Sequence, residues 1–280
     1  MPYTDVDEVS IHYEVAGHPA ASVLVLIAGG GAQLTTWEED FCSLLVAEGL
    51  RVVRLDNRDV GLSQRFGGPD DVDGGYGLAD MAADVVRVLD HLGVGAAHLV
   101  GHSMGGMIAQ TVAIDHPGRV KSLGLLSTIP GQDPRYILHG ERTELLTPPP
   151  RLTREESVEA FVRAWRPAPG APYAWDEDAV RRSAGAAYDR AYSPDGFARQ
   201  WSALLRAPER LERLGGVTAP TLVLHGRADG TLHWCAALDM AEAIEGAELR
   251  VLPDMGHLIS RDVWPVIIDG IVRMTRRAGR

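Results

Sequence analysis

The segment Gly101-His102-Ser103-Met104-Gly105 carries the residues best suited to covalent chemistry, because it fits the pattern G-x-S-x-G. Apolar residues at 97–100 precede it and apolar residues at helical spacing over 107–113 follow it, so a buried strand is expected to turn into a helix here. Such a turn holds a serine in an uncommon backbone conformation with its hydroxyl projecting from the sheet. The pattern predicts a nucleophile elbow with Ser103 as nucleophile, and the alternative is a glycine-rich turn between two core elements.

Two polar loops farther along the chain could supply the other groups that an activated serine needs. His225-Gly226-Arg227-Ala228-Asp229 follows an expected strand over 221–224, and Pro253-Asp254-Met255-Gly256-His257 follows one that ends at residue 252. A serine hydroxyl is a poor nucleophile until a histidine takes its proton, and the imidazole needs a carboxylate to fix its tautomer. The order Ser103, Asp229, His257 therefore predicts a catalytic triad.

Acyl transfer also requires two donors for the oxyanion that forms on the substrate. The backbone N–H of Met104 is one candidate, and the loop Gly29-Gly30-Gly31 after the first long strand offers the other, with Gly30 preferred. Neither a cofactor nor a metal ion is expected. Cys42 and Cys235 lie in expected helices, match no metal-binding spacing and are predicted to be buried free thiols.

Three other histidines lie near these positions. His102 precedes the serine, and strand alternation points it away from the nucleophile, which indicates a structural or pocket-lining role. His225 closes a strand and is expected to bond locally. His233 begins a helix near Asp229 and is expected at the edge of the pocket.

Other residues compete with Asp229 for the role of the triad acid. Asp254 lies three residues before His257, and both Asp254 and Asp229 follow an expected strand. The strand after the elbow helix is followed by Ser127 and Thr128, which cannot serve as an acid. The choice between Asp229 and Asp254 depends on the position of each loop.

A scaffold for these residues is indicated by strands and helices that alternate along most of the chain. Continuous apolar runs of strand length are typical of strands covered on both faces. The alternation predicts an α/β fold, with a mainly parallel sheet flanked by helices and a site at the carboxyl ends of the strands. Strands are expected over 23–27, 51–55, 97–100, 122–126, 221–224 and 248–252, and helices over about 34–48, 78–92, 234–244 and 263–274. An elbow helix is expected after Ser103, terminated by Pro117 and Gly118, and an edge hairpin over 3–9 and 10–15.

The stretch 129–215 differs from the rest, because it has proline clusters and helical periodicity but no strand-like run. Since the alternation resumes after it, the expected organisation is a core of residues 1–128 and 216–280 with a helical cap inserted over 129–215. Such a cap must roof the pocket, with part of its aromatic residues facing the substrate and its arginines toward solvent. The aromatic residues concerned are Trp165, Tyr173, Trp175, Tyr188, Tyr192, Phe197 and Trp201.

Composition narrows the class of protein and its partners. A chain of 280 residues with 45% hydrophobic residues can bury a large core. The formal charge of −11 argues against nucleic acid and anionic membranes as partners, and no apolar run approaches the roughly 20 residues that span a bilayer. The acidic start of the sequence lacks a signal-peptide pattern, so a cytoplasmic location and a small-molecule substrate are expected.

The spacing of Gly-His-Ser-Met-Gly-Gly, His-Gly-Arg-Ala-Asp and Met-Gly-His resembles that of α/β-hydrolases of the large single-domain group with a helical cap. The likeness covers essentially the whole chain outside about 129–215, and it implies the α/β-hydrolase fold. In that family the triad acid follows a strand in the position of Asp229, so the resemblance favours Asp229 over Asp254. The family more often has His-Gly after the first long strand, where this chain has Ala28-Gly29.

One loop narrows the resemblance. Asp56-Asn57-Arg58-Asp59-Val60-Gly61-Leu62-Ser63 resembles the family's Asp-x-Arg-Gly-x-Gly-x-Ser loop, with Asp59 where glycine is usual. The Arg-Asp-x-Gly form is similar to that of aclacinomycin methylesterases, which implies removal of a methyl ester from a polyketide. Asp56, Arg58 and Asp59 are expected to form an ion-paired loop that supports the site.

Together the residues and the resemblance predict a serine hydrolase that cleaves an ester, with a methyl ester favoured, of a small to medium apolar or aromatic metabolite through an acyl-enzyme. Carbon–carbon hydrolases, lactonases and cofactor-independent lyases use the same triad, so these residues leave the reaction open. A binding protein or receptor on a hydrolase body is the non-enzymatic alternative. An intact set of Ser103, Asp229 and His257 favours the enzyme.

Overall fold

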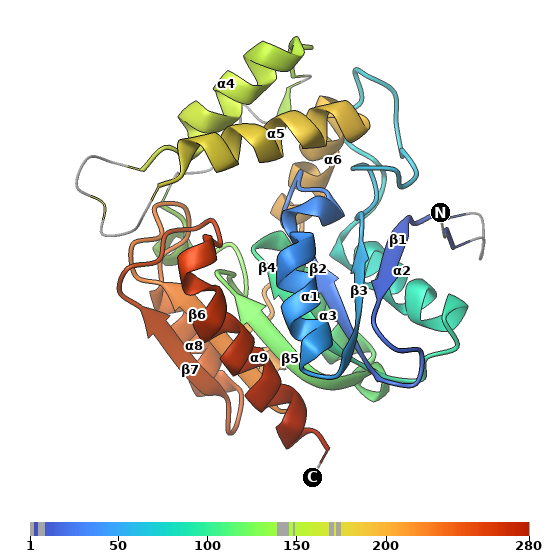
Figure 1. The fold of residues 1–280 in the computed structure, drawn as a ribbon, viewed down its shortest axis with the longest axis vertical. Helices are drawn as coiled ribbons and strands as arrows, with labels where there is room; N and C mark the ends of the chain where they lie inside the picture. Colours follow the sequence, from blue (N-terminus) through green and yellow to red (C-terminus); the bar gives the residue numbers. More distant parts are fainter. Residues whose placement is uncertain are drawn as a thin grey trace.

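The fold is that of a computed structural model, which describes residues 3–4, 9–138, 146–147, 149–167, 171 and 175–279. Within these residues, seven strands form one sheet in the order β1-β3-β2-β4-β5-β6-β7 (Figure 1). β1 pairs antiparallel with β3, and every other neighbouring pair is parallel. The strands are β1 (Tyr13–Ala16), β2 (Ser22–Ile27), β3 (Leu50–Leu55), β4 (Ala97–His102), β5 (Val120–Leu126), β6 (Thr221–Gly226) and β7 (Glu248–Leu252).

Helices cover both faces of the sheet, which explains why residues 23–27 of the central strand β2 are all apolar. Val23, Val25 and Ile27 of β2 lie in a cluster with α2, α3 and α8, whereas Leu24 and Leu26 lie in a second cluster with α1 and α9. The helices are α1 (Glu39–Ala47), α2 (Leu78–His91), α3 (Met104–Asp115), α8 (Cys235–Ala243) and α9 (Trp264–Arg277). The predicted α/β-hydrolase fold is confirmed.

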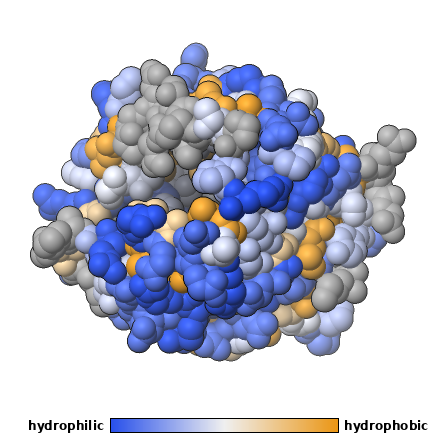
Figure 2. Space-filling view, turned by 90° about the horizontal axis from the view of Figure 1, so that it is seen from above, coloured by the Kyte–Doolittle hydropathy of each residue, from blue (hydrophilic) through white to orange (hydrophobic). Residues whose placement is uncertain are grey.

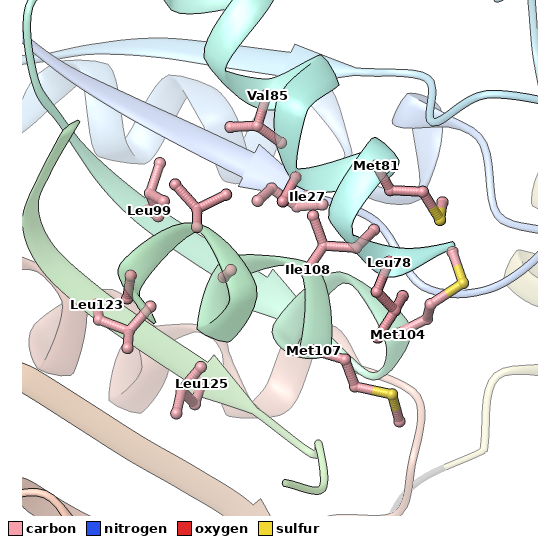
Figure 3. Packing of buried hydrophobic residues seen from close by; sticks show 14 of the residues in the cluster. Ile27, Leu78, Met81, Val85, Leu99, Met104, Met107, Ile108, Leu123 and Leu125 are labelled. Carbon is pink, nitrogen blue, oxygen red and sulfur yellow. The ribbon is translucent and has the colours of Figure 1, made fainter. Parts of the chain in front are cut away.

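The first cluster fixes α3, the helix that follows Ser103. Ile108 of α3 lies close to Ile27 of β2 in this cluster (Figure 3), and both side chains are fully buried. Each such side chain stabilises the fold by about 1.5–3 kcal/mol relative to exposure. Packing against the sheet therefore fixes the position of α3, the helix that begins directly after Ser103.

A helical insertion lies between β5 and β6, across one end of the sheet (Figure 1). It contains α4 (Arg154–Trp165), α5 (Glu177–Ala191) and α6 (Pro194–Leu205). Thr153 and Glu156 form a capping box that begins α4. Seen from this side, the surface is mostly hydrophilic with scattered hydrophobic residues (Figure 2). A short helix, α7 (Leu211–Leu214), falls inside 129–215 in sequence but contacts α3 and α8 of the core.

Two expected elements differ from the structure. The helix expected over 34–48 is a 3-10 turn, Leu34–Thr36, followed by α1. The Arg54 guanidinium donates to the Trp37 carbonyl oxygen at 2.5 Å, and this side-chain bond occupies a carbonyl that a continuous helix would use. The edge hairpin is present in part: Tyr3 and His12 form an antiparallel bridge and Thr4 N–H donates to the Ile11 carbonyl oxygen at 3.0 Å, whereas β1 pairs with β3. Residues 5–8 of that segment lie outside the described residues.

Candidate active site

Ser103 lies at the sharp turn between β4 and α3, with φ 54° and ψ −122°. Two glycines allow this turn: a Cβ on Gly101 would lie 2.1 Å from the Gly105 carbonyl oxygen, and a Cβ on Gly105 would lie 2.2 Å from the Ile27 carbonyl oxygen. The Thr128 hydroxyl donates to the Ser103 carbonyl oxygen at 2.7 Å and holds the turn from the side of β5. The partly exposed serine thus occupies the strained strand-to-helix turn that the sequence predicts.

The register of the sheet brings the candidate loops to one edge. Ile27 pairs with Gly101, and Leu126 pairs with both His102 and Leu224. Because these strands are parallel, the loops that follow them open at the same edge. The glycine loop, Ser103, Asp229 and His257 all follow strands at this edge.

Asp229 and His257 are hydrogen-bonded to each other. His257 Nδ1 lies 2.7 Å from Asp229 Oδ2, and both residues are buried. Asp229 Oδ1 accepts from the backbone N–H groups of Thr231 at 2.8 Å and Leu232 at 2.9 Å. Burial alone would raise the pKa of the Asp229 carboxyl, but the charge of His257 and hydrogen bonds from His225 and His257 hold that pKa well below its usual range. The carboxylate is therefore ionised and oriented toward the imidazole.

The neighbouring residues support this pair. His102 Nε2 bonds to the backbone carbonyl oxygen of His257 at 2.8 Å, so the residue before Ser103 holds the histidine loop beside the elbow. Burial lowers the pKa of His102 to about 3, which keeps this imidazole neutral. Asp254 is exposed, unlike Asp229. His233 is partly exposed and accepts from the Cys235 N–H at 3.2 Å, which places it at the start of α8.

Two backbone N–H groups are available for an oxyanion. Among the described residues, neither Gly30 N–H nor Met104 N–H donates a hydrogen bond within the protein. The adjacent Gly31 N–H is occupied, because it donates to Gln200 Oε1 at 2.8 Å. Gly30 is thus the better-placed donor of this glycine pair, and Met104 provides the helix N-terminus.

The loop 56–63 is ion-paired, but its charged residues pair with other elements rather than with one another. Arg58 forms a bidentate bond to the buried Asp84 of α2, at 2.6 and 2.8 Å. Asp56 Oδ2 lies 2.8 Å from Arg190 Nη2 of α5. The loop therefore connects the core to the inserted helices.

Asp59 forms the third of these pairs, with Arg199 of α6. Asp59 Oδ1 accepts from Arg199 Nε at 2.9 Å and lies 2.8 Å from Arg199 Nη2, with both side chains fully buried. The expectation that the cap arginines face solvent is therefore wrong for Arg199, because Asp59 supplies a buried counter-charge.

Two aromatic side chains of the insertion lie close to the site. The Trp165 ring stacks on the His257 ring at 5.5 Å between centroids and 4° between planes. Phe197 lies against the glycine loop, where a Cβ on Gly30 would be 3.1 Å from its Cε2. Tyr188 and Tyr192 instead stack on each other, and both hydroxyls bond to the backbone of residue 152, so they pack the insertion internally. Tyr173 lies outside the described residues.

A second serine–histidine contact lies at the opposite edge of the sheet. His98 Nε2 lies 3.0 Å from Ser22 Oγ, and its Nδ1 lies 2.8 Å from Ser122 Oγ. Burial lowers the pKa of His98 to about 4. Among the described residues no carboxylate bonds to this imidazole, and Ser22 begins a strand, so the contact lacks both the acid and the elbow that activate a serine.

Sequence reasoning missed the cap residues that touch the glycine loop. Gln200 of α6 accepts from Gly31 N–H, and its side-chain amide donates to the Arg58 carbonyl oxygen at 2.7 Å. Polar residues at helical spacing predict a solvated face, so nothing local in the sequence marks this contact.

The remaining expectations concern thiols, metals and membranes. Cys42 is a buried free thiol, as predicted, but Cys235 is partly exposed because it begins α8 at the surface. No cluster of three or more metal-ligating side chains occurs in the part of the chain that the structure describes. Across those same residues, no helix has the length and hydropathy needed to cross a bilayer.

Known proteins match this chain over most of its length. Residues 22–261 match the family model of the alpha/beta hydrolase fold. The chain is 33% identical to rhodomycin D methylesterase DnrP of Streptomyces peucetius, covering 97% of each chain, and 33% identical to a putative carbamate hydrolase RutD of Variovorax paradoxus, covering 88% and 89%. The enol-lactonase of Burkholderia xenovorans has the same fold, with a TM-score of 0.78, 23% identity and 98% and 100% coverage. By its sequence, and by the strand order and elbow described above, this protein belongs to the α/β-hydrolase family.

Proposed function

We propose that this hydrolase cleaves a carboxylic ester through an acyl-enzyme, with Ser103 as nucleophile, His257 as base and Asp229 as the supporting acid. The observation that carries the proposal is the 2.7 Å bond between His257 Nδ1 and Asp229 Oδ2 beside the serine turn. This bond leaves Nε2 of the imidazole free to take the serine proton.

The steps follow from these roles. Ser103 Oγ attacks the ester carbonyl as His257 accepts its proton, and the N–H groups of Gly30 and Met104 receive the negative charge on the carbonyl oxygen. The imidazolium then gives its proton to the departing alcohol, which leaves the acyl group on Ser103. Water, activated by His257, releases the acid and restores the serine.

A methyl ester of an apolar or aromatic acid is the favoured substrate. The Arg58-Asp59 form of the loop supports it, and so does the 33% identity to a methylesterase over 97% of the chain. Residues 129–215 would act as the cap over the acyl group, with Trp165 and Phe197 as its aromatic surfaces.

Covalent labelling tests the assignment. A fluorophosphonate should modify Ser103 alone, because only a serine activated by a base attacks phosphorus quickly. Peptide mass mapping would locate the adduct, and His257→Ala should slow labelling strongly. Labelling that continues at the same rate in His257→Ala would refute the triad, and an unlabelled, inactive protein would favour the binding-protein alternative.

Substrate selectivity tests whether aromatic side chains of the cap, such as Trp165 and Phe197, cover the acyl group. Burial of apolar surface contributes roughly 25 cal/mol per Å². Esters with an aromatic acyl group should therefore exceed acetate esters in kcat/KM by at least about tenfold, and long-chain triglycerides should be poor substrates. The comparison uses p-nitrophenyl esters with acetyl and aromatic acyl groups, and then methyl esters of aromatic acids. Equal kcat/KM for acetyl and aromatic acyl esters would exclude an aromatic surface of the cap over the acyl group, but it would not contradict the assignment of the triad. A lactone and a substrate with a cleavable carbon–carbon bond are added to the panel, and preferential turnover of either would replace the ester assignment.

A further inference from the structure

We infer that His225 is a positioning residue of the triad, because its Nε2–H lies 3.2 Å from the Asp229 oxygen that His257 uses and so moderates how strongly the carboxylate holds the imidazolium. The inference rests on the proposed function of Ser103, Asp229 and His257. It assigns a role to a buried histidine that the proposed mechanism does not use.

His225 lies in β6 and is fully buried. Its Nε2 lies 3.2 Å from Asp229 Oδ2 and 3.2 Å from the Leu232 carbonyl oxygen. Both of these atoms are acceptors, so Nε2 must carry a proton. Nδ1 is buried without a hydrogen-bond partner among the described residues, and a proton there would be a buried, unsatisfied donor. His225 is thus the neutral tautomer that donates from Nε2.

The carboxylate of Asp229 receives three hydrogen bonds and has a further N–H close by. Oδ1 accepts from two backbone N–H groups, and Oδ2 accepts from His257 at 2.7 Å. The backbone bonds fix the orientation of the carboxylate by themselves. The His225 Nε2–H, which bonds to the Leu232 carbonyl oxygen, lies 3.2 Å from Oδ2 and therefore acts mainly on the charge of that oxygen.

The positive end of this N–H dipole offsets negative charge on Oδ2 that would otherwise attract the imidazolium of His257. Without it, the carboxylate becomes more basic and the imidazolium more stable, so His257 stays protonated, and inactive as a base, up to a higher pH. His102, from β4, also faces this cluster, and burial lowers its pKa to about 3, so it stays neutral across the relevant range. The predicted effect therefore comes from His225 itself.

The test compares His225→Leu, which removes the donor, with His225→Gln, whose amide nitrogen takes the place of Nε2. The pH dependence of kcat/KM on a p-nitrophenyl ester should show an acid limb that moves up by about 0.5 to 1 pH unit in His225→Leu. Activity below the limb then falls about three- to tenfold, while the alkaline plateau stays within about threefold. His225→Gln should restore the position of the limb.

Matched controls separate this role from a structural one. His98→Leu removes another buried histidine of the sheet, at the edge away from Ser103, and should leave the limb unchanged. The ¹H resonance of the proton between His257 and Asp229 gives a readout that needs no turnover, and its titration midpoint should rise in His225→Leu. His225→Asn, which cannot place its nitrogen at Nε2, provides the donor-free comparison if the leucine variant does not fold.

The inference is overturned if the limb and the titration midpoint stay in place or move down in the donor-free variants, or if His225→Gln behaves as they do. An activity that survives Ser103→Ala would instead refute the proposed function. The two failures are therefore distinguishable.

Discussion

Asp229 and Asp254 lie at the same edge of the sheet, but their surroundings give the two carboxylates different chemistry. Asp229 is 5% exposed and accepts backbone and histidine donors, whereas Asp254 is exposed. A buried carboxylate with these donors stays charged and keeps one orientation, and it can therefore stabilise an imidazolium. An exposed carboxylate is screened by water and is free to rotate.

At this scale we predict the effect of Asp229→Asn on turnover. The amide favours the wrong imidazole tautomer, so kcat should fall by a factor on the order of 10³ to 10⁴ while the fold is kept. Steady-state kinetics at the alkaline plateau, with circular dichroism for the fold, would measure this. The control is Asp254→Asn, and a larger loss in that variant would mean that Asp254 is the acid.

At the scale of elements, α6 is tied to the core by buried polar contacts rather than by apolar packing alone. Arg199 bonds to Asp59, and Gln200 bonds to both Gly31 and the Arg58 carbonyl oxygen. A backbone contact is also close, since a Cβ on Gly196 would lie 1.9 Å from the Asp59 carbonyl oxygen. The position of α6 therefore sets the position of the glycine loop that would hold the oxyanion.

Breaking the Asp59–Arg199 pair on one side should destabilise the protein. Arg199→Met leaves a buried carboxylate without its counter-charge, which costs about 3–5 kcal/mol. Asp59 has φ 71°, a conformation that favours glycine, so the double variant Asp59→Gly/Arg199→Met should recover most of the loss. Urea unfolding of the single and double variants measures the coupling.

The exposed pair of Arg154 and Asp189 provides the control for this cycle. Arg154→Met should leave the urea midpoint essentially unchanged, because exposed ion pairs contribute little. Additive effects of the Asp59 and Arg199 substitutions would show that the buried pair does not couple α6 to the loop.

At the scale of the whole molecule, several buried imidazoles make folding sensitive to pH. Burial lowers the pKa of His98 to about 4 and that of His102 to about 3, and it also lowers the pKa of His12. Each of these groups stays neutral in the folded protein at a pH where the unfolded chain binds a proton. The unfolded state therefore gains protons first as the pH falls.

The free energy of unfolding should be highest above about pH 6.5, the ordinary histidine value, and should decrease as the pH falls toward 4. At pH 5, His98 and His102 should each account for roughly 2 kcal/mol of this loss. Urea titrations at pH 7 and pH 5 measure the difference, and His98→Leu should reduce it. Equal stability at the two pH values would contradict the lowered values.

Much of the fold and the candidate site could be predicted from the sequence because the relevant signals are local. Largely apolar segments of four or five residues located the parallel strands, and glycines around Ser103 marked a turn whose close backbone contacts exclude a Cβ. Once strands are parallel, polar residues after their ends must share one edge. Ser103, Asp229 and His257 could therefore be grouped without coordinates.

Only the tertiary structure decided which side chains from distant segments meet. In the sequence, Arg199 and Gln200 look like ordinary polar residues of a helix. Their partners are distant in sequence: Asp59 lies 140 residues from Arg199, and Gly31 lies 169 residues from Gln200. The same holds for Trp165 on His257 and for His225 beside Asp229, whose contacts depend on loop conformation. The physical reason is that the spacing of apolar residues along a helix or strand shows which of its faces is buried, whereas the residue that packs on that face depends on how the elements pack together.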